Sequence, residues 1–319
     1  MKILKIIELC RNFRKDCKSF RLVIAMLSFS AFFAQRIKCK LSDFLLRERN
    51  KRILNYLKHK YSDVINNMKD IVDNGIDGTN NRIIWVCWWQ GKDNMDALTK
   101  SCLDSIVKHS NGAKVIMITK DNYSEYANIP NHIISKLNHG IISFTHFSDI
   151  LRMNLLYLHG GFWLDVTVLL TADVPNELFS TPLFSRKGEK YGFYVSDCKW
   201  AGFMIGGQKG CILFQFMCEM FNEYWKRENR LIDYYLIDYL IKLGYMELHS
   251  IHSLIDAIPY NNPQLHSLEK LMNVPYNESE FHRITTDTSF HKLSRKAEHH
   301  KTTDGMPTFY AYLLDGKLS

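Results

Sequence analysis

Residues 148–168 read SDILRMNLLYLHGGFWLDVTV, and this stretch predicts a helix that runs directly into a strand. The helix has one apolar face, because large apolar residues recur at helical spacing at Phe147, Leu151, Leu155 and Leu158. Asp149 and Arg152 are three residues apart, so they are neighbours on the helix surface. Gly160 is a typical helix stop, and it places the start of the strand immediately afterwards.

The strand that follows the two glycines is short, apolar and marked by one carboxylate. Phe162–Val166 is apolar apart from Asp165, as expected of a strand that is buried on both faces of a parallel sheet. Ligands bind at the carboxyl ends of such strands. We therefore expect Asp149, Arg152 and Asp165 to meet at one sheet edge, where they can hold a polyol by its hydroxyls and a diphosphate through a divalent cation.

The residues upstream predict the rest of a parallel sheet. RIIWVCWWQG (82–91) is a buried strand followed by a loop, Ala97–His109 has helical spacing, and Lys114–Thr119 is a second buried strand. Strand, helix and strand in this order form a βαβ unit, so the fold class is α/β with a mostly parallel central sheet. The first of these strands ends in Trp88, Trp89 and Gln90.

The remaining chain is less regular. Strand-like pieces are expected at Leu183–Arg186, Gly192–Val195 and Gly202–Ile205, and helices at Cys211–Arg227 and Leu231–Leu243. Towards the N-terminus, helices are expected at Lys2–Cys10, Phe20–Ala34 and Ser42–Lys60. A turn cluster, DNGIDGTNN (73–81), divides the chain into an N-terminal helical extension, 1–75, and a main α/β domain, 76–319.

The N-terminal extension carries the basic character of the chain. Residues 1–60 hold 16 Lys and Arg against 4 Asp and Glu, a net charge of +12, whereas the whole chain is +8. Leu22–Ala34 is apolar apart from two serines, but it is shorter than the roughly 20 residues that span a bilayer, and no convincing signal-peptide cleavage site follows. The basic flanks suit anionic lipid head groups, so we expect peripheral docking on a membrane surface. A core helix with a solvated basic face is the alternative, and no nucleic-acid-reading motif is present.

Eight cysteines are scattered along the chain without a C-x-x-C pair or zinc-like spacing with histidine. Several lie in apolar runs, where a free cysteine behaves as a small hydrophobic residue. This pattern is typical of a reducing cytosol.

SDILRMNLLYLHGGFWLDVTV resembles the S-D-x-x-R…G-G-x-(Y/W)-x-D-x-D segment of glycosyltransferases with a DXD motif, which include the family 32 sugar transferases and the glucosyltransferase domains of large clostridial toxins. It is more similar still to the capsular polysaccharide synthesis family, which commonly reads W-L-D-A-T at this place. IIWVCWWQG resembles the first strand of that family, and FHKLSRK (290–296) resembles its late K-L-x-x-K element. The resemblance spans about 82–296.

The resemblance implies a GT-A fold, a Rossmann-like nucleotide-sugar-binding architecture, and transfer of a hexose from a nucleotide diphosphate sugar. UDP is the nucleotide that the family favours, and family 32 retains the anomeric configuration. Asp149 and Arg152 would contact hydroxyls of the donor sugar, and Asp165 would contact the ribose or sugar and approach a Mn²⁺ or Mg²⁺ ion. The second aspartate of D-x-D, which normally binds that metal, is Thr167 here.

Thr167 is the departure from the pattern. A hydroxyl can bind Mg²⁺ but brings no charge, so the metal would be held by Asp165, Thr167, diphosphate oxygens and a late residue, for which His291 is the candidate. Lys292 and Arg295 would neutralise the leaving diphosphate. Further candidates are Trp88 or Trp89 for stacking on the base, with Gln90 beside them, and Asp197 for positioning the acceptor or acting as base.

We therefore expect a glycosyltransferase on the cytoplasmic face of the membrane that extends a capsular or other surface glycan, with a glycan or lipid-linked glycan as acceptor. One alternative is a metal-dependent hydrolase of nucleotide sugars, which would need more carboxylate and histidine ligands. The other is a non-catalytic protein that binds carbohydrate or nucleotide sugar and has lost metal binding at Thr167.

Overall fold

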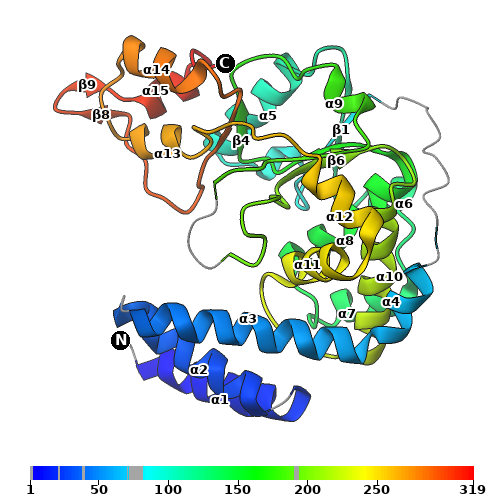
Figure 1. Cartoon of the computed structure of the whole chain (residues 1–319). Helices are drawn as coiled ribbons and strands as arrows, with labels where there is room; N and C mark the ends of the chain where they lie inside the picture. Colours follow the sequence, from blue (N-terminus) through cyan, green and yellow to red (C-terminus); the bar gives the residue numbers. More distant parts are fainter. Residues whose placement is uncertain (1–2, 21, 38–39, 70, 72–81, 190–193) are drawn as a thin grey trace.

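The computed structural model describes residues 3–20, 22–37, 40–69, 71, 82–189 and 194–319. Its centre is a five-stranded sheet with the strand order β2-β1-β3-β6-β5 (Figure 1). These strands are β1 (Ile83–Cys87), β2 (Lys114–Ile118), β3 (Gly161–Leu164), β5 (Leu183–Ser185) and β6 (Met204–Gly207). The strand predicted around Asp165 is thus real, but it ends at Leu164, and Asp165 begins the turn that follows.

Four of the five strands run in the same direction. β1 pairs in parallel with β2 and with β3, whereas β6 is antiparallel to both β3 and β5. Helix α5 (Ala97–Lys108) connects β1 to β2, as the predicted βαβ unit requires. The expected α/β class with a mostly parallel central sheet is confirmed.

Side chains of β1 and β3 alternate between two cores. Trp85 and Trp163 enter the core that contains α8 (Phe144–His159), α10 (Ile212–Arg227) and α11 (Leu236–Glu247). Ile84 and Phe162 enter the core on the opposite face, together with Ile106 of α5. Each strand is buried on both faces, and this explains why the strands are continuously apolar.

Gly160 and Gly161 make the sharp junction between α8 and β3. Both have positive φ angles, 67° and 94°, in a region that side chains with a Cβ rarely adopt. A Cβ on Gly161 would lie 2.5 Å from the carbonyl oxygen of Ile83, and the Trp85 indole donates to the Gly160 carbonyl oxygen at 2.9 Å. The junction therefore fixes the C-terminal end of α8 against the central strands.

A short ladder lies beyond the end of β3. β4 (Val168–Leu170) pairs antiparallel with β7 (Phe290–Lys292), and Val168 is opposite Lys292. The ladder joins the turn after β3 to a lobe of short elements at the upper left of Figure 1. That lobe contains α13 (Ser267–Leu271), α14 (Glu278–Thr285), β8 (Thr302–Thr303), β9 (Met306–Pro307) and α15 (Phe309–Leu314), and its core includes Leu98 and Cys102 of α5.

The N-terminal residues form α1 (Ile3–Ser19), α2 (Leu22–Ile37), α3 (Lys40–Lys60) and α4 (Ser62–Lys69). The first three stack as a layer beneath the main body in Figure 1. α3 is tied to that body, because Tyr56 donates to Glu228 at 2.6 Å and Tyr239 donates to Asn50 at 2.6 Å. The expected domain boundary at 73–81 lies outside the described residues. Across the described residues, no helix has both the length and the apolar character needed to cross a bilayer.

Several expected elements differ from the structure: the helix expected at Lys2–Cys10 extends to Ser19, and the strand expected at Gly202–Ile205 is Met204–Gly207. The helix expected from Leu231 begins at Leu236, because the Asp233 side chain accepts from the Tyr235 amide at 2.7 Å and holds a local turn. Of the strand expected at Gly192–Val195, residues 192–193 lie outside the described part, and Val195 is in a turn. The other elements are η1 (Lys92–Asn94), α6 (Tyr123–Tyr126), α7 (Asn131–Asn138), α9 (Glu177–Ser180) and α12 (His249–Asp256).

Candidate active site

An open cleft of about 680 Å³ lies at the carboxyl ends of β1 and β3. Its size is within the range of small-molecule sites. The end of β1, the flank of α8, the turn after β3, the start of α11 and the segment after β7 all line it. Seven of the residues singled out from the sequence are on its wall: Trp88, Asp149, Arg152, Asp165, Thr167, Lys292 and Arg295.

Arg152 bridges two carboxylates at the inner end of the cleft. Its Nη1 is 3.2 Å from Asp149 Oδ1, and its Nη2 is 3.1 Å from Asp165 Oδ1. The guanidinium also lies over the Trp163 ring, 4.8 Å from the centroid. Asp149 and Arg152 are buried, whereas a third of the Asp165 side chain is exposed. This set therefore presents mainly the Asp165 carboxylate to a ligand, in a fixed orientation.

His146 lies behind Asp149. The Trp225 indole donates to His146 Nε2 at 3.1 Å, and an indole nitrogen can only donate. The neutral imidazole must then carry its proton on Nδ1, which faces Asp149 Oδ2 at 3.6 Å. This separation is longer than a hydrogen bond, so Arg152 is the group in direct polar contact with the Asp149 carboxylate.

The turn from Asp165 to Val168 is fixed by backbone and side-chain contacts. The Asp165 amide donates to the Phe203 carbonyl oxygen at 2.9 Å, and the Val168 amide donates to the Asp165 carbonyl oxygen at 2.9 Å. The Trp163 indole donates to Asp165 Oδ1 at 3.0 Å. Asp165 Oδ1 therefore already accepts from both Trp163 and Arg152.

Thr167 contacts Lys292 rather than an acidic group. The Leu293 amide donates to the Thr167 carbonyl oxygen at 2.9 Å, so the segment after β7 is attached to the turn. The Lys292 ammonium donates to Thr167 Oγ1 and lies 3.4 Å from the Leu293 carbonyl oxygen. The Thr167 hydroxyl, which was expected to bind a metal, therefore accepts a hydrogen bond from the Lys292 ammonium instead.

Trp88 and Arg295 form the outer part of the cleft. The Arg295 guanidinium lies 4.8 Å from the centroid of the Trp88 ring and 3.6 Å from the Asp96 carboxylate. Trp88 is 9% exposed, and its indole nitrogen has no hydrogen-bond partner among the described residues. One buried donor at this end of the cleft therefore has no partner within the described part of the chain.

Asp238, Tyr234 and Tyr235 line the cleft although the sequence did not single them out. The Trp200 indole donates to Asp238 Oδ1 at 2.8 Å. Burial is the main cause that raises the pKa of the Asp238 carboxyl to about 7, and Trp200 opposes it. Both tyrosines are exposed. The available signal is the stretch LIDYYLIDYL (231–240), whose spacing predicts a helix throughout.

Trp89 and Gln90 are not on the cleft wall. Trp88 packs in the core that contains Ile106 of α5, whereas Trp89 packs against the core that contains α8, so the two rings are on opposite sides. The Trp89 ring packs 5.3 Å from those of Tyr123 and Phe147. Gln90 is exposed on the loop after β1. Of the three residues at this strand end, the structure brings only Trp88 to the cleft.

The interpretation of His291 as a metal ligand is corrected by its position. His291 alternates with Lys292 along β7, so when Lys292 faces the cleft, His291 faces the interior. Its side chain is fully buried, and Nε2 lies 3.2 Å from Thr171 Oγ1. Burial lowers the pKa of His291 to about 4. His291 is therefore a neutral interior residue outside the cleft.

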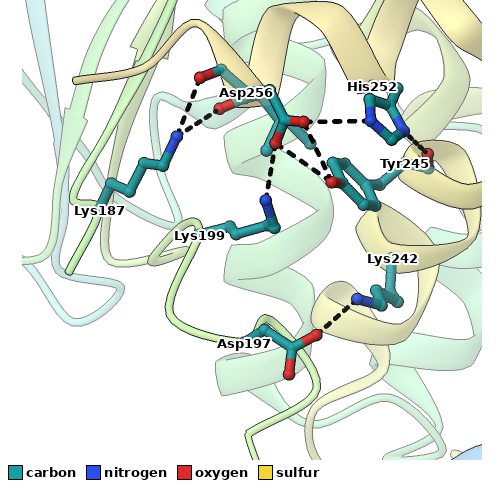
Figure 2. A network of polar contacts seen from close by, with 8 residues as sticks. Lys187, Asp197, Lys199, Lys242, Tyr245, His252 and Asp256 are labelled. Atoms are coloured by element: carbon teal, nitrogen blue, oxygen red, sulfur yellow. Dashed lines mark hydrogen bonds and ion pairs between the residues drawn. The ribbon is translucent and has the colours of Figure 1, made fainter. Parts of the chain in front are cut away.

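Asp197 also lies outside the cleft. Its carboxylate is 2.7 Å from the Lys242 ammonium and lines a separate groove of about 230 Å³ between α3 and α11. Figure 2 shows this pair beside a second network centred on Asp256. Asp197 and its neighbour Cys198 have positive φ angles, 49° and 59°, in a tight turn where the carboxylate contacts Lys242. The structure does not bring it to the expected acceptor side.

The residues around Asp165 do not fit a divalent cation well. Mg²⁺ and Mn²⁺ prefer several oxygen ligands that include carboxylates. In the described part of the chain, no group of three or more His, Cys, Asp or Glu side chains is placed to hold a metal. Asp165 Oδ1 is engaged by Arg152 and Trp163, and the Thr167 hydroxyl is engaged by Lys292.

Comparison with known proteins gives a match to a family model and a match to a solved structure. A family model described as "Capsular polysaccharide synthesis protein" matches residues 34–313. No curated protein matches the chain. Among solved structures, the chain is similar to one titled "PaToxG Glycosyltransferase", with 14% sequence identity and a TM-score of 0.39. The match covers 79% of this chain and 99% of that one.

Proposed function

Since the chain belongs to the capsular polysaccharide synthesis protein family, we propose that it is a glycosyltransferase. It moves a hexose from a nucleoside diphosphate sugar, most simply a UDP-sugar, to a glycan or lipid-linked glycan acceptor. The GT-A architecture and the retention of anomeric configuration are parts of the same proposal. The observation that carries it is the Asp149–Arg152–Asp165 set at the carboxyl ends of parallel strands, in a cleft that Lys292, Arg295 and Lys296 also line.

The two ends of the cleft suit the two ends of such a donor. Carboxylates and a guanidinium at the inner end can accept from and donate to sugar hydroxyls. Lys292 and Arg295 at the outer end can bind the diphosphate. Trp88 adds an aromatic ring and an unpaired indole donor for the nucleobase.

In the proposed reaction, the bond between the anomeric carbon and the β-phosphate oxygen breaks, and the electron pair leaves with the diphosphate. The acceptor hydroxyl oxygen bonds to the anomeric carbon from the same side, and its proton passes to the departing phosphate oxygen. Negative charge grows on the diphosphate, and Lys292 and Arg295 stabilise it. Asp149 and Arg152 keep the sugar in position for this attack.

Calorimetric titration with a panel of UDP-hexoses tests the proposal. One donor is expected to bind the wild-type protein, and Asp165→Asn is expected to weaken that binding by about tenfold or more, since a charge-assisted hydrogen bond is lost. Asp104→Asn, at an exposed position on α5 outside the cleft, is the matched control. Failure of every nucleotide sugar to bind would refute a transferase, and release of sugar only to water would favour a hydrolase.

We also propose that the N-terminal layer docks the enzyme on an anionic membrane surface. Leu22, Val23 and Met26 are about half exposed on one face of α2. The neighbouring α1 exposes basic residues, at Arg11, Arg14, Lys15 and Lys18. An apolar face next to a basic one suits the boundary between acyl chains and anionic head groups. Docking would bring the cleft to lipid-linked acceptors on the inner face of the cytoplasmic membrane.

A further inference from the structure

We propose that Lys292, supported by Arg295 and Lys296, takes the place of a divalent cation, so that this protein binds its nucleoside diphosphate donor without a metal. This inference rests on the proposed transferase function. It concerns the charge that neutralises the diphosphate, and it is tested separately from the transfer itself.

The first support is the contact between Thr167 and Lys292. The sequence pattern leads one to expect a second carboxylate at position 167, and the chain instead has a hydroxyl that accepts from the Lys292 ammonium. A metal bound between Asp165 and Thr167 would lie next to that ammonium. The two cations would repel each other and compete for the same oxygen.

The second support is that the main chain holds Lys292 in this place. Val168 and Lys292 are partners in the β4–β7 ladder, and the Leu293 amide donates to the Thr167 carbonyl oxygen at 2.9 Å. The ammonium lies 5.4 Å from the centroid of the Phe203 ring, which covers one side of it. The position of the Lys292 ammonium is therefore fixed by the β4–β7 ladder and by packing against Phe203.

The third support is the charge balance of this wall. The described part of the chain places no carboxylate in an ion pair with Lys292, so its charge is available to a ligand. Arg295 and Lys296 line the same cleft, and more than half of the Arg295 side chain is exposed. Lysine and arginine clamps can do the electrostatic work that a metal does on a departing phosphate. Lys292, Arg295 and Lys296 therefore place three cations within five residues, of which Arg295 is also 3.6 Å from the Asp96 carboxylate.

The fourth support is that each nearby acid already has one carboxylate oxygen engaged within the protein. Asp165 Oδ1 accepts from Arg152 and Trp163. Glu269 accepts from the Ser294 amide at 2.8 Å and is 3.9 Å from His299 Nε2. These contacts hold the cationic segment in shape, and they leave few oxygens for the coordination shell of a metal.

The test is calorimetric titration of the full-length protein with UDP, once in EDTA and once in Mn²⁺. We expect the wild-type affinity to agree within about threefold in the two buffers. Lys292→Gln should weaken binding in EDTA by roughly tenfold or more, as the loss of a charge-assisted contact predicts. Lys209→Gln is the matched control, because Lys209 is exposed at the end of β6 remote from the cleft.

A second variant tests the role of Lys292 independently, in case Lys292→Gln does not fold. Thr167→Asp should pair with Lys292, remove its charge from the ligand and weaken UDP binding in EDTA. Combining Thr167→Asp with Lys292→Gln restores two carboxylates, and UDP binding should then become dependent on Mn²⁺. Thermal denaturation of each variant checks that it is folded.

The outcomes separate this inference from the proposed function. Wild-type binding of UDP that disappears in EDTA and returns with Mn²⁺ would overturn the metal-independent site but leave the transferase intact. Lys292→Gln that binds UDP like the wild type in EDTA would overturn the role of Lys292. Absence of binding in both buffers would overturn the transferase proposal together with this one.

Discussion

At the scale of single residues, Arg152 is the centre of the proposed site. Its guanidinium satisfies two carboxylates at once, at 3.2 and 3.1 Å, in a place where Asp149 is buried. Without it, two negative charges would face each other with little water to screen them. The same contact therefore supports both the fold and the orientation of Asp165.

Arg152→Ala is expected to lower the free energy of unfolding by about 3 kcal/mol, since it leaves buried charge unpaired. Arg152→Lys keeps the charge but cannot bridge both carboxylates, so turnover should fall by about 100-fold or more, as for loss of a positioned donor. Urea denaturation and a transfer assay measure the two effects. Arg283→Ala is the control, because Arg283 makes an exposed pair with Glu280 at the same i, i+3 spacing. Equal effects of the two alanine variants on unfolding would contradict the account.

The raised pKa of the Asp238 carboxyl should make the folded protein less stable as the pH rises. Burial raises its pKa to about 7 in the folded protein, well above the ordinary value for aspartate. Between about pH 4 and pH 7 the folded state keeps a proton that the unfolded state has released, so this residue costs stability as the pH rises. Relative to wild type, Asp238→Asn should gain about 1–3 kcal/mol of stability from pH 4 to pH 7. A difference between the two proteins that stays constant with pH would show that the carboxyl is not perturbed.

At the scale of elements, the junction of α8 and β3 sets the geometry of the site. α8 carries Asp149 and Arg152, and β3 leads into Asp165. No loop separates α8 from β3, because Gly160 and Gly161 make the turn themselves. At both positions the surrounding backbone leaves no room for a Cβ. A displacement of one element would therefore separate Arg152 from Asp165.

Two glycines with similar φ angles test this point. Gly161→Ala should destabilise the protein by about 3 kcal/mol or more, because the new Cβ meets the Ile83 carbonyl oxygen at 2.5 Å in addition to the backbone strain. Gly210→Ala has a φ angle of 77° and nothing within 4 Å, so it should cost only the strain, about 1–2 kcal/mol. Chemical denaturation of both variants gives the comparison. Similar losses of unfolding free energy in the two variants would contradict a role for the close approach between Gly161 and the Ile83 carbonyl oxygen.

The N-terminal layer predicts binding to anionic membranes. Co-sedimentation with phosphatidylglycerol vesicles should exceed that with phosphatidylcholine vesicles and should decrease with salt. Replacing Leu22, Val23 and Met26 together with Gln should reduce binding at least about tenfold, because their apolar surface no longer enters the interface. Val107→Gln, at an exposed position on α5, is the control. Equal binding to both kinds of vesicle, or none, would contradict membrane docking.

At the scale of the whole molecule, local patterns predicted the sheet but not the contacts between distant segments. The periodicity of residues 148–168 was enough to place α8, β3 and the Asp149–Arg152–Asp165 set, because all of it lies within one continuous stretch. The contact of Thr167 with Lys292 joins positions 125 residues apart. It depends on the register of β4 and β7, which the sequence does not reveal.

The errors in the predicted site have the same origin. His291 and Lys292, like Trp88 and Trp89, are adjacent residues, and which of the two faces the cleft is decided by strand register. Asp197 was expected on the acceptor side because this region of GT-A enzymes commonly faces the acceptor, but a tight turn places its carboxylate beside Lys242. Asp238 was missed because its role depends on where α11 begins, and element boundaries are poorly encoded by periodicity.

The molecule as a whole therefore offers a cleft with carboxylates and Arg152 at the inner end and cations at the outer end. The most direct test of the account is a crystal structure of the protein with the UDP-hexose that binds best. The account predicts the hexose hydroxyls at Asp149, Arg152 and Asp165, and the diphosphate against Lys292 and Arg295. A nucleotide sugar bound elsewhere, or bound in this cleft with its hexose away from Asp165, would contradict it.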